Sequence, residues 1–333
     1  MTSQRTKNLR LVWAVAFTAI NTLYTLACAQ PSQTYPSKPI KLVVGFTPGG
    51  AADFTGRATA EALGKILGQA VVVENKPGAG SSLAAEYVSR SAAPDGYTIL
   101  LASPSSISVN PAMKPGMTHT VNTLVPITLV SNAPIILAVN PSLGINSVAD
   151  LIATAKKSPG KLNFASSGNG SAPHLGGVYF ARAVGIDIQH IPYPGGSQAS
   201  QSVIAGQVQL TFGTPPSVLP FVKANRMKGL AVSTPQRSPF APDIPGMAEL
   251  GYPQFNFGFW YGLFAPAGTP PEIIKKLHAA TQIAMNAEGP KAALAREATE
   301  VALSTSPEDF AAFLKEDAKL WTKLVKESGA TGN

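Results

Sequence analysis

Four glycine-rich turns, each placed between a strand-like apolar run and a helix-like run, are the residues of this chain best suited to chemistry. A glycine lets the backbone bend sharply and approach a ligand without a Cβ in the way. The helix that follows points its unpaired N–H groups and the positive end of its dipole at the same spot. Such turns bind anions, and in open α/β sheets they lie at the carboxyl ends of the strands. The four turns are TPGGAAD at 47–53, KPGAGSS at 76–82, SGNGSAP at 167–173 and PGGSQAS at 194–200.

The turns contain many N–H and hydroxyl donors and a single cation, Lys76. Oriented dipoles would therefore neutralise an anion more than a salt bridge would, which suits a small carboxylate. Asp53 has two interpretations. An Asp at a helix start is most often an N-cap, and the functional alternative is that its carboxylate accepts a hydrogen bond from a ligand amine, a hydroxyl or an ordered water. Both roles can coexist.

Aromatic and histidine side chains beside the turns have similar alternatives. Phe46, Tyr193 and Phe212 end strands at the predicted cleft edge, where each could stack on a ligand ring or pack in the core. Tyr193 is the best candidate for ligand contact, because its hydroxyl can also form a hydrogen bond. His174 follows the third turn, and we interpret it as a helix N-terminal residue with a satisfied ring; the alternative is a sensor of ligand charge.

The sequence lacks the motifs that a nucleotide-binding protein, a hydrolase or a metal site would need. Neither 78–83 nor 168–173 completes G-x-G-x-x-G, and a P-loop is absent. A nucleophile elbow, an HExxH motif and Cys/His metal spacing are also absent. We therefore expect no catalytic residues, no metal ligands and no cofactor. An exported α/β enzyme is the alternative, and recovery of a bound ligand unchanged would argue against it.

The N-terminus resembles an export signal. Three cations precede a mostly apolar run at 11–27, and Ala27-Cys28-Ala29 fits the small-x-small rule of signal peptidase. The run is short for a membrane span, which needs about 20 apolar residues. We expect 1–29 to be a signal peptide, with the exported protein beginning at Gln30. The alternative is lipid attachment at Cys28, although Thr25-Leu26-Ala27 poorly matches the tripeptide that such sites prefer.

Composition limits the class of protein further. Cys28 is the single cysteine, so the exported chain has no disulfide framework and must be held by its core. Hydrophobic residues make up 45% of the 333 positions, enough for two ordinary domains. Arg5, Lys7 and Arg10 lie in the leader, so its removal lowers the formal charge from +8 to +5. No Lys/Arg stripe of the kind that binds nucleic acid is present.

The order of the runs predicts two α/β lobes. Apolar strand candidates at 40–46, 71–73 and 98–102 alternate with helix-like stretches at 53–67 and 83–92, which is typical of βαβ units and a parallel sheet. A second series repeats this pattern, with strand candidates at 135–139, 162–165, 189–193, 209–212 and 229–233. The aromatic run at 255–264 is interpreted as a return crossing between the lobes.

The C-terminal part is predicted to be helical. Thr269 with Glu272, and Ser306 with Asp309, have capping-box spacing, as has the pair Ser147 and Asp150 in the second series. In the last helix an apolar face is expected to pack onto the first lobe; it comprises Phe310, Phe313, Leu314, Leu320 and Leu324.

Seven segments, together with the pair Asn110-Pro111, resemble one known family in sequence and in order. They are VVGFTPGGAADFTGR, VVVENKPGAGSSLAAEYV, APDGYTILL, GKLNFASSGNGSAPHL, IPYPGGSQA, AGQVQLTF and FWYGLFAPAGTP. The chain is similar to the Bug-type receptors, the periplasmic solute-binding proteins of tripartite tricarboxylate transporters. The resemblance covers essentially all of the chain after the leader.

The resemblance implies a two-lobe, Venus-flytrap α/β fold, each lobe a mainly parallel sheet flanked by helices. Lobe 1 would comprise 30–131 and 256–333, and lobe 2 would comprise 132–255, with crossings near 131–135 and 255–259. It also implies a monomeric periplasmic receptor that closes on a small carboxylate and delivers it to an integral-membrane permease. A sensor for a signalling system is the alternative role, and the sequence does not name the ligand.

Candidate ligand-binding residues follow from the same resemblance, because family members bind the carboxylate with the turn after the first strand and with the SSGNG-like turn of lobe 2. This chain departs from the family at two places. Gly45-Phe46-Thr47 stands where many members have a Pro-Phe-Pro run, and 213–216 replaces a cleft-facing turn that usually carries an Asp or Asn. The resemblance points to Pro48, Gly49, Gly50 and Asp53 in lobe 1 and to Ser166, Ser167, Asn169 and Gly170 in lobe 2. Thr47, Tyr193 and Thr214, which lie in or beside the same turns, are further candidates.

Overall fold

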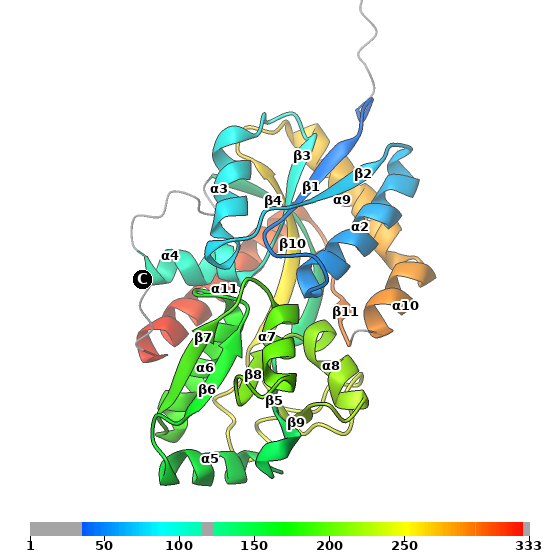
Figure 1. The fold of residues 1–333 in the computed structure, drawn as a ribbon. Helices are drawn as coiled ribbons and strands as arrows, with labels where there is room; N and C mark the ends of the chain where they lie inside the picture. Colours follow the sequence, from blue (N-terminus) through cyan, green and yellow to red (C-terminus); the bar gives the residue numbers. More distant parts are fainter. Residues whose placement is uncertain (1–34, 115–122, 297, 329–333) are drawn as a thin grey trace, which may run out of the picture. The chain divides into compact units, whose positions relative to one another are not determined.

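The computed structural model describes residues 35–114, 123–296 and 298–328 (Figure 1). The predicted leader at 1–29, with Cys28 and the cleavage site before Gln30, lies outside the described residues. The chain from Lys38 onward forms one compact unit, and the features below belong to it.

The first sheet contains six strands in a mixed arrangement. Strand β1, which lies between β3 and the edge strand β2, is almost entirely buried, as its apolar run requires, and it pairs in parallel with both. The strands β10 and β4 are antiparallel to their neighbours, because β4 leaves this sheet for the second one and β10 returns from it. In spatial order the strands are β11 (Glu300–Val301), β4 (Leu124–Pro134), β10 (Gly258–Pro266), β3 (Thr98–Ala102), β1 (Ile40–Val44) and β2 (Val71–Asn75).

The second sheet repeats the parallel core of the first. Its strand β6 pairs in parallel with β7 and β8, whereas β5 is antiparallel to β8 and β9. In spatial order the strands are β7 (Ile188–Pro192), β6 (Leu162–Ser166), β8 (Leu210–Gly213), β5 (Ile136–Val139) and β9 (Lys228–Val232). The expected parallel order thus holds for three strands in each sheet, and the sheets as a whole are mixed.

Each of the four predicted glycine turns joins a strand to a helix, as the sequence analysis expected. The helices flank the sheets, as Figure 1 shows. They are α2 (Ala51–Leu67), α3 (Ser82–Ser91), α4 (Asn110–Met113), α5 (Val148–Lys157), α6 (Ala172–Val184), α7 (Gly196–Ile204), α8 (Pro215–Lys223), α9 (Pro271–Asn286), α10 (Glu288–Arg296) and α11 (Pro307–Ser328), with short helical turns η1 (Ala79–Ser81), η2 (Ser105–Val109) and η3 (Pro141–Leu143).

Two of the three predicted capping boxes cap a helix. The Ser147 hydroxyl accepts from the Asp150 N–H, and the Ser306 hydroxyl accepts from the Asp309 N–H, both at 3.0 Å. The third prediction is wrong, because α9 has Pro270 as its N-cap and the Thr269 hydroxyl donates instead to the Pro266 carbonyl.

The chain crosses between the sheets at two adjacent points. Strand β4 ends at Pro134 and β5 begins at Ile136, so a single residue, Ile135, separates the two sheets. Ile135 and Ser233 hydrogen-bond in both directions, from the Ile135 N–H to the Ser233 hydroxyl and from the Ser233 N–H to the Ile135 carbonyl, each at 2.8 Å. The Ser233 hydroxyl also donates to the carbonyl of Phe257, just before β10. The two crossing segments are therefore tied together.

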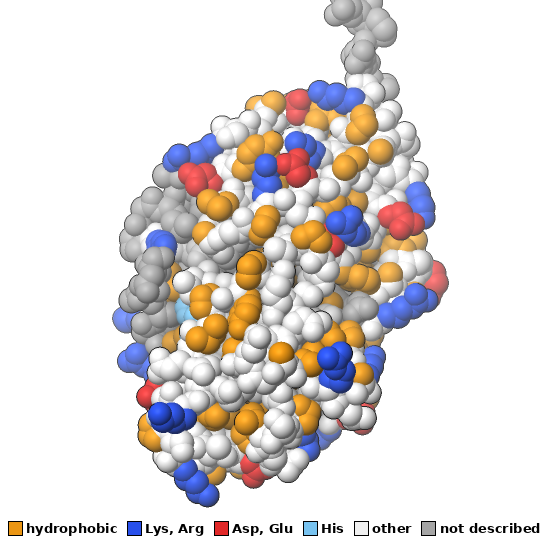
Figure 2. All heavy atoms as spheres, in the orientation of Figure 1, with side chains coloured by type: hydrophobic (Ala, Val, Ile, Leu, Met, Phe, Trp, Pro, Cys, Tyr) orange, Lys and Arg blue, Asp and Glu red, His pale blue; other side chains and the backbone are white. Residues whose placement is uncertain are grey.

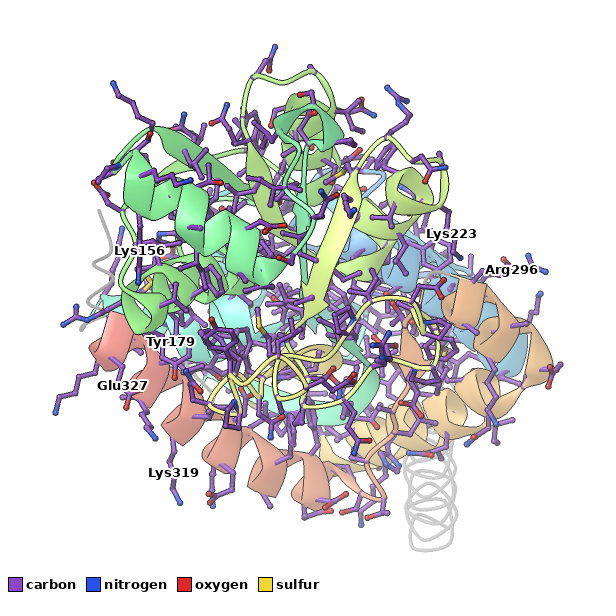
Figure 3. All side chains as sticks on the ribbon, turned by 90° about the horizontal axis from the view of Figure 1, so that it is seen from below. Lys156, Tyr179, Lys223, Arg296, Lys319 and Glu327 are labelled. Carbon is purple, nitrogen blue, oxygen red and sulfur yellow. The ribbon has the colours of Figure 1, made fainter. Side chains whose placement is uncertain are left out.

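Helix α11 packs on elements of both sheets: it contacts β4 and η2 of the first and α6 of the second. Phe310, Leu314 and Leu324 are buried as predicted, whereas Phe313 and Leu320 are more than a third exposed, so the expected apolar face is narrower than predicted. The buried residue Trp321 completes it. Figure 3 shows the far end of this contact, with Tyr179 on α6 and Glu327 on α11.

The carboxyl group of Asp317 lies inside this contact. Its Oδ1 accepts from the indole N–H of Trp260 at 2.9 Å and of Trp321 at 3.0 Å, and its Oδ2 accepts from the Ser108 hydroxyl at 2.7 Å. Burial raises the pKa of Asp317 to about 6, although the three hydrogen bonds act in the opposite direction. The native state therefore holds this proton more tightly than an unfolded chain does.

The folded protein binds the Asp317 proton more tightly than the unfolded chain does. We therefore expect the free energy of unfolding to fall as pH rises from the ordinary pKa of an Asp through about 6, the pKa in the folded protein. Relative to Asp317→Asn, which keeps the shape and stays neutral, the wild-type free energy of unfolding should drop by about 2 kcal/mol between about pH 4.5 and 7. Denaturant unfolding across this range measures it.

A pH-independent difference between the two proteins would contradict the shift. Asp317→Leu is the control for packing, because it leaves three buried donors without an acceptor and should destabilise the protein at every pH, by about 1–3 kcal/mol per donor.

Candidate functional site

Helix starts from both sheets converge on a small cavity of about 20 Å³. Its walls come from the N-terminal ends of α2, α7 and α8, from Pro173 near the start of α6, and from β10. Among the described residues that line it, none carries a charge. They are Phe46, Gly50, Ala51, Ala52, Ser167, Pro173, Gly196, Ala199, Thr211, Phe212, Gly213, Thr214, Ser217, Phe259 and Tyr261.

The N-caps of α2 and α7 leave backbone N–H groups of their first turns to a ligand, whereas α8 begins with two prolines and its Ser217 N–H donates to the Thr214 carbonyl. Gly50, Gly195 and Thr214 are the N-caps of α2, α7 and α8, and none of them caps its helix with a side-chain hydrogen bond. Helix N-termini without side-chain caps favour a bound anion through their N–H groups and dipoles. In α8 the donor is a hydroxyl, because its first two residues are prolines; Thr214 and Ser217 place their hydroxyls 3.3 Å apart.

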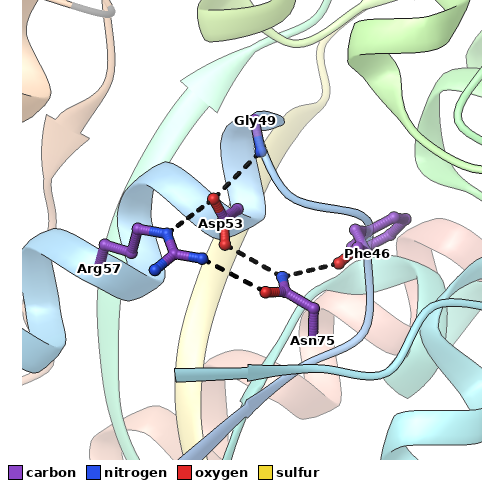
Figure 4. Close-up of polar contacts among 5 residues, drawn as sticks. All are labelled: Phe46, Gly49, Asp53, Arg57 and Asn75. Carbon is purple, nitrogen blue, oxygen red and sulfur yellow. Dashed lines mark hydrogen bonds and ion pairs between the residues drawn. The ribbon is translucent and has the colours of Figure 1, made fainter. Parts of the chain in front are cut away.

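The turn between β1 and α2 is held from behind by a polar network, drawn in Figure 4. Asp53 Oδ2 accepts from the Gly49 N–H at 3.1 Å and from Arg57 Nε at 2.9 Å. Asn75 Nδ2 donates to Asp53 Oδ1 at 3.0 Å and to the Phe46 carbonyl at 2.9 Å. Gly49 has a φ of +82°, which a residue with a Cβ adopts only under strain. Both ends of the turn are therefore fixed.

Asp53 is not the N-cap that the sequence analysis favoured. Helix α2 begins at Ala51 with Gly50 as N-cap, so Asp53 is the third helical residue, and it reaches back to the N–H of Gly49, one residue before the N–H that a capping box would use. Burial raises the pKa of Asp53, but the hydrogen bonds from Arg57, Gly49 and Asn75 outweigh it and lower the pKa overall. The carboxylate stays charged, and its hydrogen bonds all lie within this network.

The sequence analysis missed Arg57 and Asn75. The spacing of four between Asp53 and Arg57 on one helix is a signal for an ion pair. Nothing local distinguishes Asn75, because it reaches Asp53 from the next strand. The predicted cation Lys76 forms an ion pair with Glu74 at 2.8 Å, and its ammonium lies 4.3 Å from the centre of the Tyr87 ring.

The turn between β6 and α6 is held by two histidines. Ser166 Oγ lies 2.6 Å from His190 Nε2 and accepts from the Gly168 N–H at 3.1 Å. His174 Nδ1 accepts from the Gly170 N–H at 3.3 Å, and the two imidazole rings stack with centroids 4.0 Å apart. His174 is thus a helix N-terminal residue with a satisfied ring, as predicted. His190 was missed, because it lies on the neighbouring strand β7.

A second cavity, of about 270 Å³, adjoins the first and shares Phe46 and Ser167 with it. The turn 78–81 and Asn110 form one wall, and Asn110 Nδ2 anchors that turn by donating to the Ala79 carbonyl at 3.1 Å and to Ser82 Oγ at 2.8 Å. The lining is Gly45, Phe46, Gly78, Ala79, Gly80, Ser81, Asn110, Met113, Lys114, Ser167, Gly168, Asn169, Gly170, Tyr193 and Pro194.

The turns of the two sheets touch on both sides of these cavities. The Thr47 hydroxyl donates to Gln198 Oε1 at 3.2 Å, and the Ala172 N–H donates to Ser105 Oγ at 2.9 Å. A Cβ added at Gly80 would lie 2.8 Å from the Asn169 carbonyl oxygen, so the backbones approach too closely for a side chain there. Figure 2 shows hydrophobic and uncharged groups across the middle of the face drawn, with charged side chains mostly above and below.

The structure places the predicted site residues in different surroundings. Gly50, Ser167 and Thr214 line the first cavity, and Ser167, Asn169, Gly170 and Tyr193 line the second. Ser166 is buried behind its turn. On the other side of α2, Gly49 and Asp53 line a groove of about 830 Å³, while Thr47 and Pro48 line none of the three.

Aromatic residues complete the first cavity. Phe46 and Phe212 line it and are buried, so ligand contact by these strand-end aromatics stays a prediction. Phe259 and Tyr261 of β10 were missed, because the run at 255–264 was interpreted only as a crossing. In the described part of the chain no cluster of three metal-ligating side chains occurs, and no helix has both the length and the apolar character to span a bilayer.

Two sheets flanked by helices, with glycine turns facing a shared cavity, define a two-lobe solute-binding protein. The sequence profile described as the tripartite tricarboxylate transporter family receptor matches residues 55–330, and the chain belongs to this family. It is 35% identical to protein BugT of Bordetella pertussis over 307 residues, 92% of this chain and 94% of that protein. The family and its structural neighbours are solute-binding proteins, not enzymes.

Three solved structures share the fold over their full length. The periplasmic binding protein BugD has a TM-score of 0.84 with 32% identity, over 89% of this chain and 99% of that one. The R. palustris protein Rpa4515, solved with adipate, has a TM-score of 0.85 with 30% identity, over 89% and 99%. MatC of Rhodopseudomonas palustris, solved with bound malate, has a TM-score of 0.83 with 28% identity, over 87% and 100%.

The two histidines behind the β6–α6 turn make a testable contribution to stability. Burial lowers the pKa of His174 to about 4, and burial together with the neighbouring His174 ring lowers the pKa of His190 to about 3. Both pKa values in the folded protein lie below the ordinary histidine value of about 6.5. The two histidines therefore stabilise the folded state above that pH, and this stabilisation is lost as pH falls below it. Relative to a His174→Asn/His190→Gln variant, wild type should lose about 2 kcal/mol per histidine between about pH 7 and 5.

Unfolding free energies of both proteins across this pH range provide the measurement. A constant offset between the two curves would mean that the histidines titrate normally in the folded protein.

Proposed function

We propose that this protein is an extracytoplasmic receptor that captures a small carboxylate between the turn 47–53 and the turn 166–170 and delivers it to the permease of a tripartite transporter. The observation that carries the proposal is a cavity lined by uncharged residues, where the start of α2 and Ser167 of the turn 166–170 meet beside the starts of α7 and α8, which have no side-chain caps. Membership of the receptor family supports it, as do the neighbours solved with adipate and malate.

Backbone dipoles suit a receptor that must also release its ligand. A helix N-terminus contributes roughly half an elementary charge, and its donors are already oriented before the anion arrives. The negative charge of Asp53 is taken up by Arg57 and by hydrogen bonds on the side away from the cavity, so it does not repel a carboxylate strongly. The aromatic walls from Phe46, Phe212 and Phe259 would contact the carbon skeleton of the ligand.

We assign the lobes as in the sequence analysis, with lobe 1 at 30–131 and 256–333 and lobe 2 at 132–255. The single residue between β4 and β5 and the tie between Ser233 and Phe257 support hinges at the two crossings. A cavity of about 20 Å³ has room for about one water, so a carboxylate would enter when the lobes separate. A ligand that bridges turns of both lobes favours closure, because it binds the closed state more tightly.

We also assign export to the periplasm by the leader 1–29, function as a monomer, and delivery to an integral-membrane permease. The +5 charge expected after cleavage and the receptor family are consistent with these assignments. Intact mass of the exported protein tests the leader: it should begin at Gln30 without lipid, and a diacylglyceryl mass on Cys28 would make the protein a tethered receptor instead.

Gly50→Val should abolish carboxylate binding without unfolding the protein. Gly50 lines the cavity in ordinary backbone geometry, and an added Cβ would meet only the Thr47 carbonyl oxygen, at 3.9 Å. With a carboxylate at about 100 times its Kd, wild type should gain roughly 2.7 kcal/mol of stability, measured as a thermal shift. The variant should keep its unliganded Tm and show no shift.

Gly289→Val is the matched control, since a Cβ added at Gly289 on α10 has no atom within 4 Å, and Gly289 lines the groove of about 830 Å³ instead of either cavity. If wild type shows no shift with di- and tricarboxylates, acidic amino acids and aromatic acids, or if Gly50→Val binds like wild type, the proposed site is wrong.

Closure predicts a change of size in solution. Small-angle scattering should give a smaller radius of gyration for wild type at saturating ligand than for Gly50→Val under the same conditions, because only wild type should close on the ligand. Equal radii, with ligand binding to wild type confirmed by calorimetry, would contradict ligand-driven closure.

A further inference from the structure

Tyr261 points toward the first cavity from the first sheet. Its strand β10 lies between β4 and β3, and side chains alternate between the two faces of a strand. Phe259, two residues earlier, lines the cavity as Tyr261 does, and the two rings meet edge to face with centroids 4.8 Å apart. Trp260 between them faces the other way and donates its indole N–H to Asp317. The Tyr261 side chain therefore lies on the cavity side of the sheet.

The hydroxyl of Tyr261 is free and open to water. Among the described residues, four buried hydroxyls have no partner and are closed to water; they belong to Thr55, Ser81, Ser103 and Ser131. The Tyr261 hydroxyl is not one of these four, and it forms no hydrogen bond within the described part of the chain. Because the whole residue is only 4% exposed and lines the first cavity, its hydroxyl opens into that cavity.

The other hydroxyls in the cavity wall have competing partners. The Thr211 hydroxyl donates to the Ala165 carbonyl at 2.9 Å, and the hydroxyls of Thr214 and Ser217 lie 3.3 Å apart. Burial raises the pKa of Tyr261 well above its ordinary value of 10, so its hydroxyl keeps the proton at physiological pH. Tyr261 thus offers the cavity a donor that no protein acceptor occupies.

We infer that Tyr261 is a ligand-binding residue of this receptor, and that its hydroxyl donates a hydrogen bond to the carboxylate held between the turns 47–53 and 166–170. The inference rests on the proposed function, because that function supplies the carboxylate. A carboxylate accepts hydrogen bonds and donates none, which matches a free donor. The cavity of about 20 Å³ has room for about one water, and a carboxylate oxygen is of similar size.

The first sheet orients this donor before a ligand arrives. Tyr261 pairs with Ser131 of β4 in the antiparallel ladder, and its ring packs against Phe259. A tyrosine side chain has only two torsions, and a buried ring has lost most of that freedom in the unliganded protein. Its hydrogen bond to a ligand therefore costs little further ordering.

Tyr261→Phe tests the inference, because it removes the hydroxyl and keeps the ring. In isothermal titration with di- and tricarboxylates, acidic amino acids and aromatic acids, every ligand of wild type should bind the variant about 10- to 100-fold more weakly, the effect of one lost hydrogen bond to a charged group. The loss should be similar for all of them, because the carboxylate is the group that they share. The unliganded variant should keep the wild-type Tm, since its hydroxyl has no protein partner to lose.

Tyr179→Phe is the matched control, because Tyr179 is also buried, at 8% exposed, but lines neither cavity. It should bind every ligand as wild type does.

Three results would overturn the role of Tyr261 while leaving the carboxylate site in place. They are wild-type affinities for Tyr261→Phe, a loss confined to ligands that carry a second polar group, and a lower Tm of the unliganded variant, which would mean that the hydroxyl is bonded within the protein. If no carboxylate of the panel binds wild type, the proposed function itself fails.

Discussion

The site depends on one constraint: the glycine turn after β1 must present its backbone to the cavity, and only groups behind it can hold it there. Asp53 satisfies that constraint with a buried carboxylate that accepts from the Gly49 N–H and Arg57 with one oxygen and from Asn75 with the other. Because Asn75 also binds the Phe46 carbonyl, the turn is fixed at both ends. The front of the turn is left with backbone donors and no side-chain charge, which is what an anion requires.

In the facing turn of the second sheet, uncharged groups hold the backbone in place from behind. His190 and His174 lie behind the β6–α6 turn and bind Ser166 and the Gly170 N–H. Burial lowers the pKa of both rings, so they are neutral hydrogen-bonding groups at physiological pH. One turn is thus supported by an ion pair and the other by a stacked imidazole pair, and neither support adds charge to the cavity lining.

The crossing strands place the two turns opposite each other. Strand β4 of the first sheet continues into β5 of the second after one residue, and β10 re-enters the first sheet antiparallel to β4, so both crossings lie side by side. Helix α11 reinforces this junction through Asp317, whose carboxyl binds Trp260 of β10 and Ser108 of η2. The same strand β10 adds Phe259 and Tyr261 to the cavity, so the element that joins the sheets also contributes to the site.

The sequence by itself determined the positions of the turns, the alternation of strands and helices, and the family. These features are local: a glycine after an apolar run bends the chain wherever the run ends, and a Ser three residues before an Asp caps a helix, as at Ser147 and Ser306. Most of the predicted strands and all four glycine turns were therefore found, whereas β4 was not predicted, since its apolar run is interrupted by Pro126 and polar residues.

Tertiary structure decided which side chains support the turns and which contact the cavities. Asn75 meets Asp53 across 22 residues and His190 meets Ser166 across 24, because adjacent strands bring them together. Neighbours distant in sequence also decide three further features. They are the antiparallel course of β10, the position of Asp53 behind its turn and the unpartnered hydroxyl of Ser81. Local propensity acts over a few residues, whereas hydrogen-bond partners and burial are set by packing between elements, and that packing exists only in the folded chain.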